Sequence, residues 1–148
     1  MSLIYQIKKF SELTVQELYA ILQLRNEVFA VEQNCVYSDM DNRDQDSLHL
    51  MGMCEGQILS YTRLLPPGLV YDEPSIGRVV TATGIRRTGE GYELMERSIA
   101  AIHERYGMRP IRISAQVYLV RFYVSLGFKV QGESYIEDHI EHIQMLLG

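Results

Sequence analysis

Residues 86–91, Arg-Arg-Thr-Gly-Glu-Gly, place two arginines and two glycines between an apolar β-branched run and a run with helical periodicity. Apolar residues recur at helical spacing from Leu94 to Ile102, so the glycines mark a turn from a strand into a helix. The first N–H groups of such a helix have no partner within it and, with the helix dipole, favour an anion. The segment therefore predicts a site for a phosphorylated ligand.

Two common phosphate motifs do not fit this segment. A Walker A loop needs Lys and Ser/Thr after its last glycine, whereas Gly91 is followed by Tyr92 and Glu93. A dinucleotide-binding fingerprint needs a third small residue where Leu94 stands. A P-loop NTPase and a Rossmann domain are therefore disfavoured. A tight strand-to-helix connection without a ligand is the alternative.

A second informative segment follows at residues 122–128, Phe-Tyr-Val-Ser-Leu-Gly-Phe. The pattern Arg86-x-x-Gly89-x-Gly91 resembles the pyrophosphate loop of the GNAT superfamily of acetyl-CoA-dependent N-acetyltransferases. The 122–128 segment resembles the late GNAT segment in which a tyrosine on a short helix precedes a Gly-Phe pair. Two motifs in this order are much more specific than either alone.

Further segments narrow the resemblance to the ElaA-like branch, nearly end to end. This resemblance implies a small stand-alone acetyltransferase domain spanning residues 1–148. The segments that carry it are 24–35 (Leu-Arg-Asn-Glu-Val-Phe-Ala-Val-Glu-Gln-Asn-Cys), Asp39, Asp41, His49, 76–79, 114–116 and 137–143.

The resemblance implies acetyl-CoA as co-substrate and no metal. The backbone of one strand would pair with the pantetheine arm, and the N–H groups of the glycine loop would hold the pyrophosphate. Because a carboxylate would repel that group, we expect the Glu90 side chain to point away from it. The cofactor-binding residues implied are Val79, Val80, Thr81, Arg86, Arg87, Thr88, Gly89, Glu90, Gly91, Tyr92 and Gln116.

Tyr123 is the predicted general acid, because a phenol can protonate the thiolate that leaves during acyl transfer. Its alternative is a core tyrosine on an apolar helix face. The acceptor amine must also lose a proton, and the candidate bases are Glu32, His49 and His142, with a relay through water as the alternative. For each of the three, an ordinary structural role is the more probable interpretation.

The resemblance also suggests acceptor-binding residues, namely Arg25, Phe29, Glu32 and Asp41. The acidic run Asp39, Asp41, Asp44 and Asp46 is interpreted first as a solvated loop and second as a surface that steers a cationic amine. It does not fit a calcium loop, and His139 and His142 on one strand would point to opposite faces. We therefore expect no metal site.

These residues need a mixed α/β scaffold to position them. Strands are expected at 3–10, 48–54, 57–65, 75–83, 110–116, 128–135 and 140–147, with a tight hairpin at Glu55-Gly56. Thr14-Val15-Gln16-Glu17 fits a capping box that opens a helix, and further helices are expected at 90–106 and 117–126. The GNAT resemblance implies a mixed, mostly antiparallel central sheet with helices on both faces.

Composition limits the remaining classes. The chain has 148 residues, which suits one domain, and its formal net charge of -5 argues against nucleic acid as a partner. It contains no apolar run of membrane-spanning length, and Cys35 and Cys54 are expected to be reduced thiols of a cytoplasmic protein. The expected function is N-acetylation of a small amine by a monomer or homodimer. The alternatives are a non-catalytic acyl-CoA-binding or sensing module and, less favoured, a nucleotide-binding interaction domain.

Overall fold

A computed structural model describes residues 2–34, 36 and 38–148. The main elements are β1 (Ile4–Lys9), α1 (Val15–Asn26), β2 (Leu48–Cys54), β3 (Gln57–Leu65), β4 (Ser75–Thr81), α2 (Glu90–Tyr106), β5 (Ile111–Gln116), α3 (Val120–Ser125), β6 (Lys129–Glu137) and β7 (Ile140–Leu147). A π-helical turn, η2 (Glu27–Glu32), extends α1, and short 3-10 turns are η1 (Phe10–Glu12), η3 (Asp44–Asp46), η4 (Thr83–Ile85) and η5 (Val117–Leu119). The expected mixed α/β class is confirmed.

The described strands form one seven-stranded sheet in the order β1-β2-β3-β4-β5-β7-β6. All neighbours are antiparallel except β4 and β5, which run parallel. β7 pairs with β5 and separates it from β6, so the last two strands form a hairpin folded back onto β5. The sheet is therefore mixed and mostly antiparallel, as the GNAT resemblance implied.

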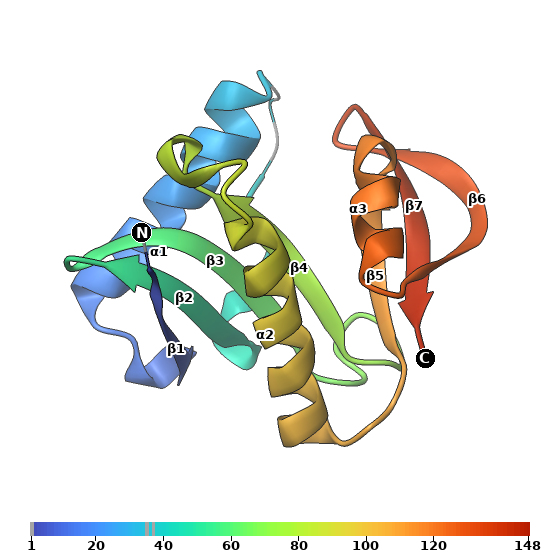
Figure 1. Ribbon diagram of the computed structural model, residues 1–148, viewed down its shortest axis with the longest axis horizontal. Coiled ribbons are helices and arrows are strands. Elements are labelled where there is room, and N and C mark those ends of the chain that lie inside the picture. Colours follow the sequence, from blue (N-terminus) through green and yellow to red (C-terminus); the bar gives the residue numbers. More distant parts are fainter. Residues whose placement is uncertain (1, 35, 37) are drawn as a thin grey trace.

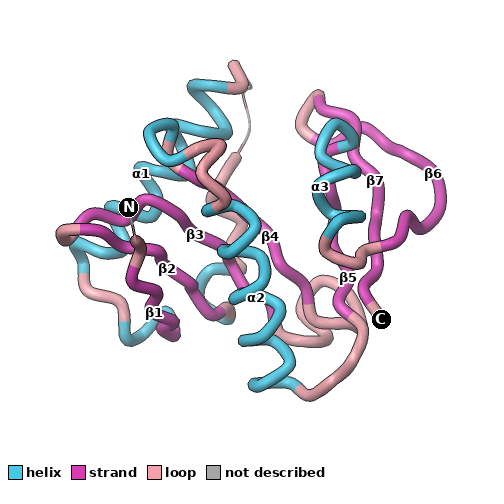
Figure 2. The backbone as a smooth tube through the Cα atoms, viewed as in Figure 1, coloured by secondary structure: helices cyan, strands magenta, loops and turns pink. Residues whose placement is uncertain are grey.

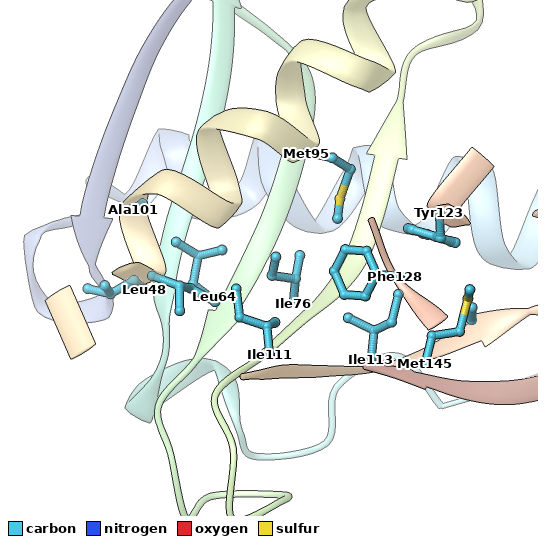
Figure 3. Close-up of a cluster of buried hydrophobic side chains, with 12 residues drawn as sticks. Leu48, Leu64, Ile76, Met95, Ala101, Ile111, Ile113, Tyr123, Phe128 and Met145 are labelled. Atoms are coloured by element: carbon cyan, nitrogen blue, oxygen red, sulfur yellow. The ribbon is translucent and has the colours of Figure 1, made fainter. Parts of the chain in front are cut away.

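Helices cover both faces of the sheet. In Figure 1, α1 lies behind β2, β3 and β4, whereas α2 and α3 lie in front. Side chains alternate along a strand, so Leu64 of β3 packs under α2 while Tyr61 packs under α1. The larger cluster (Figure 3) contains Leu48, Leu64, Ile76, Met95, Ala101, Ile102, Ile111, Ile113, Ala115, Tyr123, Phe128 and Met145.

A β-bulge interrupts the pairing of β3 with β4. Tyr61 lies opposite Val80 and Arg63 opposite Gly77, so two residues of β4 face one residue of β3. Arg78 adopts a positive φ of 49° at this point. A bulge bends the strand and shifts its side-chain alternation, which is why β4 contributes to the clusters on both faces.

The strands β4 and β5 part soon after they meet. Their only paired register is Ser75 with Arg112, at the start of both strands. Arg112 strengthens that end, because its N–H donates to the Pro74 carbonyl at 3.1 Å and its guanidinium pairs with Glu73 at 3.0 Å. Beyond this point the strands diverge and the sheet opens into a V (Figure 1).

The structure confirms most of the expected elements. Thr14 and Glu17 form the capping box, with Glu17 N–H donating to Thr14 Oγ1 at 3.0 Å, and the helix at Glu90–Tyr106 has the expected bounds. The strand expected at 75–83 ends at Thr81, and the helix expected at 117–126 is divided into η5 and α3. Its end at Gly127, with a φ of 102°, matches the expected C′ glycine.

Candidate active site

A cleft of about 960 Å³ occupies the space between the diverging strands. Residues of β4, the glycine loop and η2 line one side, and residues of β5, α3 and the β6–β7 turn line the other. Since the gap in the sheet removes the neighbour that β4 would otherwise have, its edge here faces the cleft instead of another strand. Val79, Val80 and Thr81, which the sequence predicts as cofactor-binding residues, line this edge.

The glycine loop connects β4 with the start of α2 at the open end of the V (Figure 2). Arg87 has a φ of 65° and Gly89 a φ of 85°, so two left-handed residues turn the chain into the helix. The Thr88 hydroxyl donates to the Ile85 carbonyl at 2.5 Å and fixes the turn internally. The expected loop residues that line the cleft are Arg86, Arg87, Gly89, Gly91 and Tyr92; Thr88 and Glu90 are not among the described lining residues.

Arg86 is held by a carboxylate of η2 on the same side of the cleft. Its guanidinium forms two hydrogen bonds with Glu32 of η2, and its Nη2 also donates to the Thr81 carbonyl at 3.2 Å. These hydrogen bonds lower the pKa of the Glu32 carboxyl below its ordinary value. An incoming anion would therefore compete with Glu32 for Arg86.

The Glu90 side chain turns away from the cleft, as expected. It is buried, with 9% of its surface exposed, and Oε2 accepts a hydrogen bond from the Tyr5 hydroxyl at 3.3 Å. Tyr5 lies on β1, on the far side of α2 from the V-shaped gap (Figure 1). The backbone of Glu90 thus lies at the start of α2, while its carboxylate lies beside Tyr5 of β1.

Gln116 lies at the end of β5 and lines the cleft. Its side-chain amide exchanges hydrogen bonds of 3.3 and 3.4 Å with that of Gln33, which follows η2. Two side-chain pairs therefore connect the end of η2 to the rest of the entrance, one to the glycine loop and one to β5. Whether Gln116 also binds a cofactor stays a prediction.

Tyr123 lies on α3 at one end of the larger core cluster (Figure 3) and also lines the cleft. It is buried, with 6% exposed, and its ring packs edge-on against Phe122 and Phe128. Burial raises its pKa well above the ordinary value, so its hydroxyl stays protonated across the physiological range. Tyr123 therefore belongs both to the hydrophobic core and to the lining of the cleft, so its burial in the core is compatible with a role in the site.

The three candidate bases differ in where they lie. His49 is buried with its ring nitrogens 2.6 Å from the Tyr61 hydroxyl and 2.8 Å from the Asp44 carbonyl, and burial lowers its pKa. It is not among the described residues that line the cleft, so the geometry argues against His49 as the base. Glu32 and His142 both line the cleft.

His142 has a defined orientation on β7. Its Nδ1 lies 2.8 Å from the Ile140 carbonyl, which can only accept, so in the neutral ring the proton is on Nδ1. Nε2 then carries the lone pair and lies 3.6 Å from Glu137. The ring stacks on Tyr135 at a centroid distance of 6.2 Å.

Comparison with known proteins agrees with this geometry. The family model of the acetyltransferase (GNAT) domain matches residues 9–147. The chain belongs to the GNAT family. It is 39% identical to the protein ElaA of Escherichia coli over 137 residues, covering 91% of this chain and 90% of ElaA. It is also 39% identical to a UPF0039 protein of Synechocystis sp. over 140 residues, covering 94% and 91% of the two chains.

Solved structures support the same assignment. A crystal structure of an acyl-CoA N-acyltransferase from Pseudomonas aeruginosa matches with a TM-score of 0.95 and 43% identity, covering 99% of this chain and 100% of that one. The crystal structure of E. coli ElaA matches with a TM-score of 0.92 and 36% identity, over 99% of each chain. The resemblance to the ElaA-like branch is therefore confirmed, and with it acyl transfer as the general chemistry of the family.

Three arginines of this GNAT chain pair with three of the four aspartates of the acidic run. Asp44 Oδ1 lies 2.9 Å from a guanidinium nitrogen of both Arg25 and Arg63. Asp39 pairs with Arg25 and Arg78 at 2.9 Å, and Asp41 pairs with Arg63 at 2.8 Å. The interpretation of Asp39, Asp41 and Asp44 as a solvated loop was wrong, because these carboxylates form a partly buried network that fastens the loop to β3 and β4.

The expected acceptor-binding residues do not all line the cleft. Phe29 and Asp41 line the cleft, whereas Arg25 is completely buried and is not among the described lining residues. Arg25 therefore acts through Asp39 and Asp44 and supports the wall of the cleft. Residues not foreseen from the sequence also line the cleft, namely Gln33, Arg43, Arg63, Arg78, Tyr118 and Phe122. Gln33, Arg78 and Phe122 fall within segments that carry the GNAT resemblance, but no local motif assigns any of the six to the cleft, because folding alone brings the segments that carry them together.

The structure also bears on the histidine and cysteine predictions. His139 lies in the β6–β7 turn with a φ of 66°, not on a strand as supposed, although β7 does carry His142. The part of the chain that the structure describes contains no group of three or more His, Cys, Asp or Glu side chains suited to a metal. Cys54 is a free thiol, and Cys35 lies outside the described residues.

Asp44→Asn should destabilise the fold by about 3 kcal/mol, because it leaves two buried guanidinium groups without their shared carboxylate. Urea unfolding at pH 7 measures this loss. Asp46→Asn is the matched control, since Asp46 is exposed and should stay within about 0.5 kcal/mol of wild type. Equal stability of the two variants would contradict the structural role of the network.

The same network predicts how the free energy of unfolding declines at low pH. Burial alone would raise the pKa of Asp41 and Asp44, but the hydrogen bonds from Arg63 and Arg25 outweigh it and lower both pKa values. A lowered pKa contributes stability above the unfolded-state value of about 3.9 that is lost as the pH falls toward the folded-state value. The wild-type free energy of unfolding should therefore decline below about pH 4, and this decline should be weaker in Asp44→Asn.

Proposed function

We propose that this chain transfers an acetyl group from acetyl-CoA to the primary amine of a small acceptor, by direct attack within a ternary complex. The observation that carries the proposal is the cleft between β4 and β5, which has the glycine loop and the α2 N-terminus at its entrance and Tyr123 on its opposite wall. Membership of the GNAT family supports acyl transfer in general. The acetyl group, the amine and the single catalytic domain are part of the proposal.

The residues present fit an acyl-CoA. Beyond Ser75, the β4 edge has no register partner on β5 among the described residues, so backbone groups from Val79 onward face the cleft and suit the amides of a pantetheine arm, although Arg86 already donates to the Thr81 carbonyl. The N–H groups of residues 87–92 suit the pyrophosphate, with Arg86 and Arg87 supplying positive charge. Gln116 lies where its amide can bond the arm, in exchange for Gln33.

The reaction needs one group to give a proton and one to take it. As the amine nitrogen bonds to the acetyl carbon, the carbon–sulfur bond breaks and its electron pair goes to sulfur. Tyr123 donates a hydrogen bond, and then its proton, toward that sulfur. Its raised pKa keeps the hydroxyl protonated and favours hydrogen bonding to the thiolate over early transfer.

His142 is the base that the geometry favours, because Nε2 carries the lone pair when Nδ1 donates to the Ile140 carbonyl. Glu32 is a weaker base, since Arg86 lowers its pKa. Glu137 Oε2 lies 3.6 Å from Nε2, on the side of the ring where the proton would arrive. A water can complete the path from the amine to His142.

The direct test is an acceptor screen with acetyl-CoA, read by release of free thiol, beside calorimetric titration with CoA. We expect CoA to bind and at least one small primary amine to release thiol in proportion to the acylated product. No binding at tens of micromolar would contradict the proposal. Tight binding with no thiol release across the amine panel would favour the sensing module instead.

Tyr123→Phe should lower kcat by about a hundredfold, the size of one general acid, while the CoA dissociation constant stays within about twofold. Tyr19→Phe is the control, because Tyr19 is 72% exposed on α1. Wild-type kcat should not fall between pH 8 and pH 10, since the raised pKa keeps Tyr123 protonated there. A kcat unchanged in Tyr123→Phe would remove this residue from the mechanism.

Substitution of each remaining candidate base, His142 and Glu32, should have a different effect on kcat. His142→Gln should lower kcat at least about tenfold. Glu32→Gln should retain kcat and tighten CoA binding by up to about threefold, because it releases Arg86 from an exposed ion pair. Initial rates and calorimetry give both readouts. Loss of kcat in Glu32→Gln alone would reverse the assignment.

A further inference from the structure

A cluster of side chains on the far side of α2 controls the one carboxylate inside the glycine loop. Tyr5 of β1 pairs in register with Gly52 of β2. A Cβ on Gly52 would lie 3.0 Å from Tyr5 Cε1 and 2.1 Å from Ser60 Oγ. The bare glycine therefore makes room for the tyrosine ring to cross β2 toward α2.

The ring ends at two carboxylates of the first helical turn. The Tyr5 hydroxyl donates to Glu90 Oε2 at 3.3 Å, and it lies 3.5 Å from Glu93 Oε2. Burial and then the charges of Glu90 and Glu93 raise the pKa of Tyr5 to about 12, so the hydroxyl remains a donor. Arg97 covers the ring at 4.4 Å from its centroid and reaches Glu93 at 3.4 Å. The Tyr5 ring is thus held between the sheet and the helix.

The position of Glu90 makes this contact consequential. Glu90 is the first residue of α2, and its neighbours Gly89 and Gly91 both line the cleft. The helix dipole favours a carboxylate at that position, but a carboxylate turned toward the cleft would oppose a bound anion. Only 9% of Glu90 is exposed, and its partner is on a strand 85 residues away in sequence.

We infer that Tyr5 is a positioning residue for cofactor binding, holding the Glu90 carboxylate on the β1 side of α2 so that the N–H groups at the helix start remain available to the pyrophosphate. This inference rests on the proposed function, because it takes CoA as the ligand. Tyr5 should affect only the binding of the pyrophosphate. It should not affect the binding of the pantetheine arm or the reacting groups.

The test compares two ligands, CoA and pantetheine, which has the same arm without the pyrophosphate. Tyr5→Phe should raise the CoA dissociation constant about threefold to fivefold, the effect of one partly screened charge. The pantetheine dissociation constant should not change. Adding Glu90→Gln to Tyr5→Phe should restore CoA binding to within about twofold of wild type, since the released charge is then gone. Calorimetry for CoA and NMR titration for pantetheine give these values.

Controls keep the outcome specific. Tyr19→Phe should leave both dissociation constants unchanged, and Glu90→Asp should weaken CoA binding as Tyr5→Phe does, because its shorter chain keeps the charge but loses Tyr5. Glu90→Asp thus serves if Tyr5→Phe does not fold. Equal weakening of both ligands, or a double variant that stays weak, would overturn the inference alone. Failure of wild type to bind CoA would overturn the proposed function as well.

Discussion

The parting of β4 from β5 is the constraint on which the rest of the site depends. One register pair, Ser75 with Arg112, joins the two halves of the sheet, and Arg112 fastens that end through its N–H and its guanidinium. Past this point the backbone edge of β4 must find other partners, because a buried strand edge without them is costly. The bulge at Arg78 turns β4 further and moves Val80 to the core face under α1. A cleft along an open strand edge is the direct consequence, and such an edge suits an extended amide-bearing ligand.

The entrance of this cleft is closed by polar pairs that a ligand can exchange. Glu32 reaches Arg86 from η2, and Gln33 reaches Gln116 from the same turn. Exposed ion pairs and amide pairs of this kind contribute little stability, so their replacement by a charged ligand costs little. The wall behind them is different, because the pairs of Arg25 and Arg63 with Asp44 are buried and hold the 38–47 loop firmly against β3. The site thus combines an exchangeable entrance with a fixed wall.

Local signals explain what the sequence could predict. The capping box at Thr14 and the helix-ending glycine at residue 127 can be predicted from a few neighbouring residues, and the bounds of α2 follow from its periodicity. The motif at 86–91 likewise predicted a strand, a turn and a helix start that the fold contains. Contacts between residues that are far apart in the sequence leave no such local pattern. No local pattern around Asp44 indicates Arg25 and Arg63, which lie 19 residues away on either side, so the sequence alone predicts a solvated loop for the acidic run. The burial of His49 is equally hidden from the local sequence, since Tyr61 and the Asp44 carbonyl reach its ring only after folding.

The charges around the glycine loop show how an acidic chain can offer a site to an anion. The formal net charge is -5, which by itself opposes a ligand carrying several phosphates. At distances beyond about 8 to 10 Å, however, salt screens that repulsion, and the nearby carboxylates decide the local potential. Three of them lie close to the loop in sequence or space, and each is engaged. Glu32 binds Arg86, Glu90 accepts from Tyr5, and Glu93 contacts Arg97. With these three carboxylates engaged, the backbone N–H groups of the loop and helix start can favour an anion locally, so overall acidity does not exclude an anion site at this end of the cleft.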